Sequence, residues 1–163
     1  IKKMHQKFEF EYEVLADIKD LPIADQELLE AARKATQNAY APYSNFLVGA
    51  AARLSNNQIV IGANQENASF PVGVCAERAL LNSVGSQFPN LTITTMAISY
   101  QPVGKDSNEP ISPCGMCRQS LLDFETRYDA PIKIILAGMQ GQVMIIASAS
   151  NLLPFGFDGK ILK

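Results

Sequence analysis

Short apolar runs with turn residues between them predict a chain in which strands and helices alternate. Continuous apolar runs or period-2 alternation indicate strands, and apolar residues at helical spacing indicate amphipathic helices. The predicted strands are residues 46–54, 58–63, 91–100, 132–137 and 142–147. The predicted helices are residues 25–40, 75–84 and 114–128, with a short one near residues 148–152.

The order of these elements predicts the fold class. The turn Ser55-Asn56-Asn57 joins the first two strands into an antiparallel hairpin, whereas the strands that alternate with helices add βα units. Helices that alternate with strands cover both faces of a sheet. We therefore expect an α/β protein, a three-layer α/β/α sandwich with a mixed sheet of about five strands.

Residues 1–24 have a pattern of their own. Phe8, Phe10, Tyr12 and Val14 alternate with glutamates, which is the period of a half-buried strand. Such a strand needs a partner edge, either on the body of the domain or on a neighbouring subunit. We predict an N-terminal extension over residues 1–24 and a single domain over residues 25–163.

Composition and charge narrow the class of partner. The 163 residues are 47% hydrophobic and 18% charged, which is typical of one globular domain. A net charge of -2 argues against a polynucleotide partner and favours a small neutral substrate. The sequence contains no apolar run of about 20 residues and no signal-peptide pattern, and three cysteines, an odd number, favour a cytoplasmic location.

The three cysteines fall in two motifs that each open a predicted helix. They are Val74-Cys75-Ala76-Glu77-Arg78 and Pro113-Cys114-Gly115-Met116-Cys117-Arg118-Gln119. If the two helix N-termini face each other, three thiols converge, and helix N-termini favour the thiolate form. Zinc takes four ligands, so three cysteines leave one position for water, as in catalytic zinc sites. A Cys-x-Glu motif followed by Pro-Cys-x-x-Cys is the pattern of a water-activating zinc site, with Cys in the place of the more familiar His.

Charged residues beside the cysteines have predicted roles. Glu77 lies within the first turn of its helix, near the open zinc position, where a carboxylate can take a proton from water and pass it on. Three thiolates leave the zinc electron-rich, which weakens it as a Lewis acid. Arg78 and Arg118 directly follow the ligands, and we expect them to offset this charge by donating to the thiolate sulfurs.

Simpler explanations exist for each of these residues. The Cys114–Cys117 pair alone fits a redox motif or half of a structural zinc site. A redox motif, however, requires a thioredoxin-like order of strands and helices, which this chain lacks. A structural site would need His5, the only histidine, which we regard as a solvated tail residue with no role. Glu77 alone would be a helix-capping acid, and Arg78 and Arg118 alone would be surface charges.

Five motifs in order resemble the short, all-cysteine-zinc cytidine deaminases. They are Phe46-x-Val48-Gly49-Ala50-Ala51, Asn64-x-Glu66-Asn67-Ala68-Ser69-Phe70, Cys75-Ala76-Glu77-Arg78, Pro113-Cys114-Gly115-x-Cys117-Arg118-Gln119 and Leu152-Leu153-Pro154-x-x-Phe157. The resemblance covers residues 25–157 and leaves residues 1–24 outside. It implies hydrolytic deamination of cytidine and deoxycytidine to uridine and deoxyuridine, with release of ammonia, as in pyrimidine salvage.

The resemblance also implies site residues. One Zn2+ per subunit would be held by Cys75, Cys114 and Cys117, and Glu77 would carry protons between the water, the ring nitrogen and the leaving amino group. The substrate-binding set it implies is Phe46, Asn64, Glu66, Ala76, Phe70 and Phe157. Asn64 and Glu66 would hold the ribose 3′-hydroxyl, since an amide and a carboxylate together donate to and accept from a hydroxyl.

Family members of this length form homotetramers with shared active sites. Phe157 would close a neighbour's pocket over the base, although Phe155 adds a second candidate ring, and Phe70 would lie near a neighbour's ribose. Many relatives have Tyr at the position of Phe70, so the corresponding hydroxyl is absent from this chain. The loop over residues 101–110 is longer than is typical and leads to the second cysteine motif, where it could reshape the pocket rim.

Two other functions stay open on the sequence. A deaminase of a modified cytosine nucleoside, of the blasticidin type, shares the zinc motifs but lacks the Asn-x-Glu-Asn loop that begins at Asn64. A non-catalytic zinc-binding module would be free to lose Glu77, which this chain retains. Neither nucleic acid nor a membrane is expected as a partner.

Overall fold

A single mixed sheet organises the computed structural model, which describes residues 3–162. Its strand order is β1-β6-β5-β4-β2-β3. The strands are β1 (Tyr12–Leu15), β2 (Phe46–Leu54), β3 (Ile59–Ala63), β4 (Ile93–Pro102), β5 (Lys133–Ala137) and β6 (Val143–Ile146). Residues 1 and 2 of the predicted extension (residues 1–24) and residue 163 of the predicted domain (residues 25–163) lie outside the described residues.

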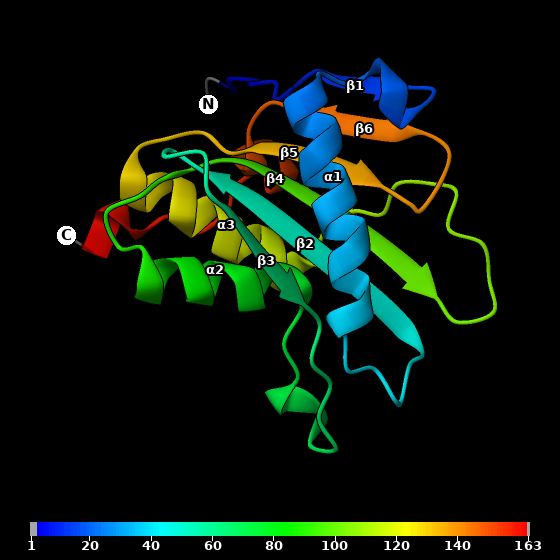
Figure 1. The fold of residues 1–163 in the computed structure, drawn as a ribbon. Coiled ribbons are helices and arrows are strands. Elements are labelled where there is room, and N and C mark those ends of the chain that lie inside the picture. Colours follow the sequence, from blue (N-terminus) through cyan, green and yellow to red (C-terminus); the bar gives the residue numbers. More distant parts are fainter. Residues whose placement is uncertain (1–2, 163) are drawn as a thin grey trace.

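Helices cover both faces of the sheet. The helix α1 (Ile23–Ala35) crosses one face, and α2 (Ala76–Gln87) and α3 (Gly115–Tyr128) cover the other (Figure 1). Only β4 and β5 pair in parallel, whereas the other neighbours are antiparallel. The predicted three-layer α/β/α architecture with a mixed sheet is confirmed.

A separate apolar cluster lies on each face, because successive side chains of a strand point to opposite sides. On β4, Met96 and Ile98 belong to the cluster under α2 and α3, whereas Ala97 belongs to the cluster under α1. Leu28 and Leu29 of α1 are fully buried in the second cluster. Full burial of a leucine contributes about 1.5–3 kcal/mol, so these layers stabilise the frame that carries the site.

The sheet has six strands rather than the predicted five, because the N-terminal segment adds β1 along β6. This strand is also shorter than the alternating pattern of residues 8–14 predicts. The partner strand β6 is itself only four residues long, so it can pair with Tyr12–Leu15 and no further. Leu15 and Ile18 pack against the α1-side cluster, and Leu21 is buried within it.

The remaining helical elements are short 3-10 turns. They span Ile18–Asp20, Thr36–Asn38, Phe70–Val72, Ala149–Leu152 and Gly159–Leu162. The helix predicted over residues 25–40 therefore ends as an α-helix at Ala35 and continues only as one such turn. Among the described residues, no helix combines the length and the apolar composition that a membrane crossing requires.

Candidate functional site

Three cysteine sulfurs meet where α2 and α3 begin. Cys75 is the N-cap residue of α2, Cys114 is the N-cap residue of α3, and Cys117 lies in the first turn of α3. The Sγ atom of Cys114 lies 3.8 Å from that of Cys75 and 3.5 Å from that of Cys117, and all three lie within 4.8 Å of one another. Tetrahedral zinc with sulfur ligands at about 2.3 Å separates the sulfurs by about 3.8 Å. The three thiols therefore fit one zinc ion.

The backbone explains why the cysteines converge. Cys75 and Cys114 both have the extended conformation that an N-cap requires, so each chain turns into its helix at the ligand itself. The first turn of α2 presses on β3 at Gly62, where a Cβ atom would lie 2.6 Å from the carbonyl oxygen of Ala76. A residue without a side chain at this position lets α2 approach the sheet closely enough to bring Cys75 to α3.

The surroundings shift the pKa values of two of the three thiols in opposite directions. The neighbouring Cys117 thiol stabilises the Cys75 thiolate, and with help from Cys114 and the positive charge of Arg78 it lowers the pKa of Cys75 from 9.0 to about 6. The same contact with Cys75, together with burial, raises the pKa of Cys117. One thiolate therefore exists near neutral pH before any metal binds, which favours capture of a divalent cation.

Glu77 lies in the first turn of α2 and is only 5% exposed. Burial raises the pKa of its carboxyl group, although hydrogen bonds with its own backbone N–H and with the Cys117 thiol oppose this shift. A buried carboxyl group beside a metal-ligand thiol is able to hold a proton at a higher pH than an exposed one. Its position and its chemistry suit a proton carrier.

The two arginines next to the ligands differ in their contacts. The positive charge of Arg78 contributes to the lowered pKa of Cys75. Arg118 instead donates from Nε to the carbonyl oxygen of Pro113 at 2.8 Å, and from Nη1 to that of Leu152 at 3.2 Å. These bonds fix the segment that carries Cys114, so Arg118 has a positioning role in addition to its charge.

The predicted substrate loop pairs with the residue directly before Cys75. Gln65 and Val74 form an antiparallel bridge with two backbone hydrogen bonds of 2.9 Å. The next residues in this register are Asn64 beside Cys75 on one side, and Glu66 beside Gly73 on the other. The bridge therefore places the Asn64–Glu66 loop and the metal site next to each other.

Asn64 is also part of the frame of the site. Its side-chain oxygen accepts a hydrogen bond from Val48 N–H at 2.8 Å, and its amide nitrogen donates to Phe46 O at 2.9 Å. The side chain thus extends the pairing of β3 with β2. An amide nitrogen carries two hydrogens, so this arrangement commits one of them and leaves a second donor for a ligand.

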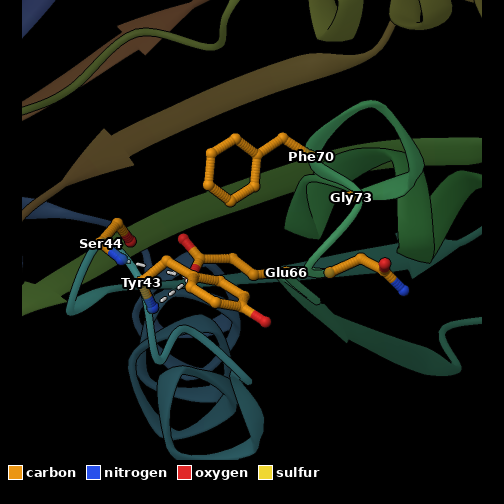
Figure 2. Close-up of a pocket in the computed structure, with 6 residues that line it drawn as sticks. Tyr43, Ser44, Glu66, Phe70 and Gly73 are labelled. Carbon is orange, nitrogen blue, oxygen red and sulfur yellow. Dashed lines mark hydrogen bonds between the residues drawn. The ribbon is translucent and has the colours of Figure 1, made fainter.

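Glu66 forms the floor of a pocket of about 330 Å³. The pocket is lined by Tyr43, Ser44, Glu66, Asn67, Phe70 and Gly73. One carboxylate oxygen accepts from the N–H groups of Tyr43 at 2.9 Å and Ser44 at 3.3 Å, and Figure 2 shows it between Tyr43 and Phe70. Hydrogen bonds with Ser44 and Tyr43 lower the pKa of Glu66, so it is an ionised acceptor at neutral pH.

The predicted aromatic residues have distinct surroundings. Phe46 stacks on Tyr100 with ring centroids 5.2 Å apart, and it is half-buried at the start of β2. Phe70 contacts Tyr43 edge-on at 5.6 Å within its own chain but stays exposed. Ala76 is fully buried, so neither its side chain nor its backbone is accessible in this structure.

The tail after Pro154 is held by a side chain of α3. Gln119 donates to Phe157 O at 2.7 Å and accepts from Phe157 N–H at 3.2 Å. Phe155 is 98% exposed and has a positive φ of 57°, so the described chain offers it no cover. The sequence analysis did not assign Gln119 a role, although it stands inside the second cysteine motif.

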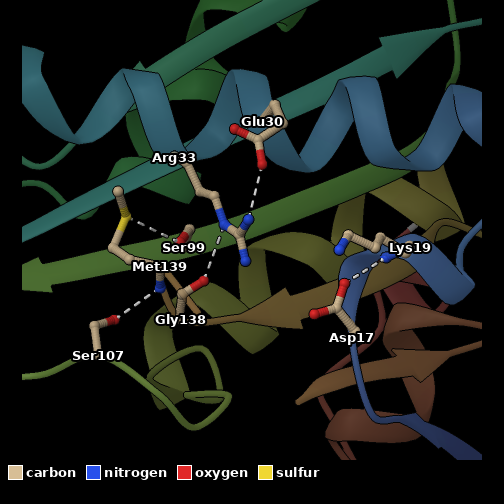
Figure 3. A network of polar contacts seen from close by, with 8 residues as sticks. All are labelled: Asp17, Lys19, Glu30, Arg33, Ser99, Ser107, Gly138 and Met139. Carbon is tan, nitrogen blue, oxygen red and sulfur yellow. Dashed lines mark hydrogen bonds and ion pairs between the residues drawn. The ribbon is translucent and has the colours of Figure 1, made fainter. Parts of the chain in front are cut away.

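The long loop before the second cysteine motif is anchored at Ser107. Its hydroxyl donates to Tyr100 O at 2.6 Å and accepts from Met139 N–H at 3.1 Å (Figure 3). At Gly138 a Cβ atom would lie 2.1 Å from Ser107 O, so only glycine allows this close contact. The loop packs against the 138–141 turn, and none of its residues lines the described part of the Glu66 pocket.

Comparison with known proteins gives a consistent picture. The sequence profile described as "Cytidine and deoxycytidylate deaminase zinc-binding region" matches residues 22–128. The chain is 35% identical over 135 residues to a cytidine deaminase of Halalkalibacterium halodurans, a match that covers 83% of this chain and 95% of that protein. It is 45% identical over 89 residues to a cytidine deaminase of Mycoplasma genitalium, covering 54% of this chain and 63% of that one.

A solved structure agrees with these sequence matches. The crystal structure of cytidine deaminase from Burkholderia pseudomallei superimposes with a TM-score of 0.69 at 36% sequence identity. The alignment covers 80% of this chain and 97% of that one. The profile match spans both cysteine motifs, the Asn64–Glu66 loop and the sheet between them. The chain therefore belongs to the family of the cytidine and deoxycytidylate deaminases that carry this zinc-binding region.

Proposed function

We propose that this protein hydrolyses cytidine and deoxycytidine to uridine and deoxyuridine, with release of ammonia. The observation that carries the proposal is the register of the Gln65–Val74 bridge, which sets Asn64 beside Cys75 and so joins a hydroxyl-binding loop to a three-cysteine metal site. Bound at these cysteines, zinc supplies a Lewis acid that makes water nucleophilic at neutral pH.

The residues of the chain account for the proton transfers. Water adds to C4 of the ring, and the amino group at C4 leaves as ammonia. Glu77 accepts one proton from the water and gives it to N3; it then takes the second proton, from the new hydroxyl at C4, and gives it to the leaving amino group. Its raised pKa, due to burial, suits a carboxyl group that must be protonated and deprotonated in each cycle.

Asn64 and Glu66 support the choice of a nucleoside. In this proposal the ionised Glu66 accepts from the 3′-hydroxyl, and the second amide hydrogen of Asn64 donates to it. Cytidine and deoxycytidine both carry this hydroxyl, so both are substrates. None of the described residues that line the Glu66 pocket is basic, so a nucleotide phosphate finds no counter-charge there.

The roles of the aromatic residues complete the proposal. Phe46 packs against the pyrimidine, Ala76 is placed next to the base by its position between Cys75 and Glu77, and Arg78 with Arg118 offsets the charge of the three thiolates. Phe70 and Phe157 are both exposed, which supports their proposed place in the pocket of a neighbouring subunit within a homotetramer. Three reduced cysteines as zinc ligands support a cytoplasmic location. Deamination of free nucleosides suits a role in pyrimidine salvage.

The substrate class is tested by incubating the zinc-loaded protein with cytidine, deoxycytidine, deoxycytidylate and blasticidin S. We expect the two nucleosides to be converted with similar efficiency, and the nucleotide and blasticidin S to be poor substrates. Glu66→Ala is expected to raise KM for both nucleosides more than it lowers kcat, whereas Asn67→Ala, beside it in the pocket, changes KM less. Conversion of blasticidin S alone, or of deoxycytidylate alone, would overturn the assignment.

A further inference from the structure

The N-terminal arm, residues 3–11, continues β1 along the edge of the sheet (Figure 1). Its side chains are exposed throughout. In the sheet of the described residues, β1 is an edge strand with β6 on its inner side. Phe8 and Phe10 of the arm and Tyr12 of β1 carry three neighbouring aromatic rings, with successive centroids 6.3 Å apart. They remain 53%, 39% and 55% exposed, so an aromatic surface lies at an unpaired edge of the sheet of the described residues.

The body of the protein orients the arm without burying it. Phe10 and Tyr12 line a groove of about 290 Å³ together with Leu152 and Pro154 of the body. The arm is therefore held extended, with Phe8 and the outer backbone edge of the strand available to a partner.

Charged residues fill the other face of the arm in a definite order. The basic residues Lys3, His5 and Lys7 come first, and the acidic residues Glu9, Glu11 and Glu13 follow at the same two-residue spacing. The exposed ion pair of Lys7 with Glu9 shows that both halves share one face. An antiparallel pair of such segments sets the basic half of one copy against the acidic half of the other.

Only one register satisfies both faces. If Phe8 lies opposite Phe8 of a second copy, Lys7 faces Glu9 and Lys3 faces Glu13, and His5 lies opposite Glu11. A shift of two residues opposes Lys7 to Lys7 or Glu9 to Glu9, and like charges directly opposite each other are destabilising. A shift of one residue sets Phe8 opposite a charged residue and mixes the aromatic and charged faces.

We propose that the N-terminal arm pairs antiparallel with the arm of a second copy of this chain, with Phe8 facing Phe8 across a two-fold axis. The contact joins two sheets edge to edge and covers the aromatic rings of both arms. It uses a segment outside the deaminase motifs, so it is independent of the subunit contacts proposed for Phe70 and Phe157.

A register-specific disulfide tests this contact. In the zinc-loaded full chain, Phe8→Cys is expected to form a disulfide-linked dimer under mild oxidation, because facing residues of paired strands meet the roughly 7 Å Cα limit of a disulfide. Phe10→Cys is the matched control. The proposed register separates the two residues 10 by four positions, roughly 13 Å along the strands, so this variant does not cross-link. Non-reducing electrophoresis and intact mass identify the product.

Charge exchange gives a second readout in the Phe8→Cys background. Lys7→Glu sets Glu opposite Glu9 at two symmetric places and is expected to slow cross-linking by about 2- to 30-fold. Adding Glu9→Lys restores an opposite pair and is expected to restore the rate. The proposal is overturned if Phe8→Cys gives no linked dimer, if Phe10→Cys links equally well, or if the double charge exchange stays as slow as Lys7→Glu.

Discussion

Arg118 Nε donates a hydrogen bond of 2.8 Å to the carbonyl oxygen of Pro113, the residue directly before Cys114. The same guanidinium reaches Leu152 O at 3.2 Å and so connects α3, the approach to a zinc ligand and the 3-10 turn Ala149–Leu152. A planar fork of donors makes such paired bonds, which a lysine ammonium does not reproduce.

Arg118→Lys therefore separates geometry from charge. Because the two carbonyl bonds are lost while the positive charge is kept, we expect the free energy of unfolding of the zinc-loaded protein to fall by about 1.5–3 kcal/mol. Urea denaturation measures this change. Arg78→Lys serves as the control, since Arg78 acts on Cys75 through its charge. A stability of Arg118→Lys equal to wild type would show that the fork is dispensable.

Glu125 is a buried carboxylate that the sequence analysis did not single out. It accepts hydrogen bonds from the N–H groups of Ile132 and Ala149 at 2.7 Å and of Ser150 at 2.9 Å, and from the hydroxyl of Ser148. Its side chain thereby joins the end of α3 to the entry of β5 and to the 3-10 turn Ala149–Leu152.

Glu125→Ala leaves three backbone donors without this acceptor. At about 1–3 kcal/mol for each buried donor, we expect a loss of about 3 kcal/mol or more in the free energy of unfolding. Asp123→Ala, at an exposed position of the same helix, is expected to stay within about 0.5 kcal/mol of wild type. Equal effects of the two substitutions in chemical denaturation would refute the organising role of Glu125.

Ser107→Ala tests the anchor of the long loop. The variant removes the donor to Tyr100 O and the acceptor for Met139 N–H in a buried environment, so a loss of about 1–3 kcal/mol is expected. Ser112→Ala, at an exposed position later in the same connection, is the control. If thermal unfolding finds both variants as stable as wild type, the loop does not depend on this hydroxyl.

Local pattern was enough to predict the layers of this fold but not its edges. The strands over residues 46–54 and 132–137 combine continuous apolar runs with clear turn residues, and their buried positions follow directly. The extent of β1 could not be predicted from local pattern. Residues 8–14 alternate along their whole length, but the number that pair is set by β6, which is far away in sequence.

The functional site, too, could be predicted only where the signal is local. Cysteine spacing predicted a three-sulfur cluster, because helix starts can be recognised locally. The bonds of Arg118 and Asn64 could not be predicted, since they depend on which carbonyl and N–H groups the folded sheet brings near. Pairing of Gln65 with Val74 joins two loop segments, and neither has the alternating pattern that signals a strand.

The metal-free protein should contain one ionised thiol near neutral pH. Because the pKa of Cys75 is lowered to about 6, this thiol is protonated below that pH and is a thiolate above it. Ultraviolet absorbance of the thiolate, followed as pH rises from acid to neutral in the metal-free protein, should show one step near pH 6. Cys75→Ser should remove the step, and Arg78→Ala should move it to higher pH; a step that persists in Cys75→Ser would assign it to another thiol.

The central claim is that a three-cysteine zinc site works with Glu77 as the proton carrier. The most direct measurement is kcat for cytidine in Glu77→Gln, with the zinc content determined on the same sample. We expect one zinc per chain, as in wild type, and a kcat lower by about 100- to 10,000-fold, since the amide keeps the shape of the side chain but cannot carry the proton. A zinc-loaded Glu77→Gln that deaminates cytidine at the wild-type rate would contradict the account.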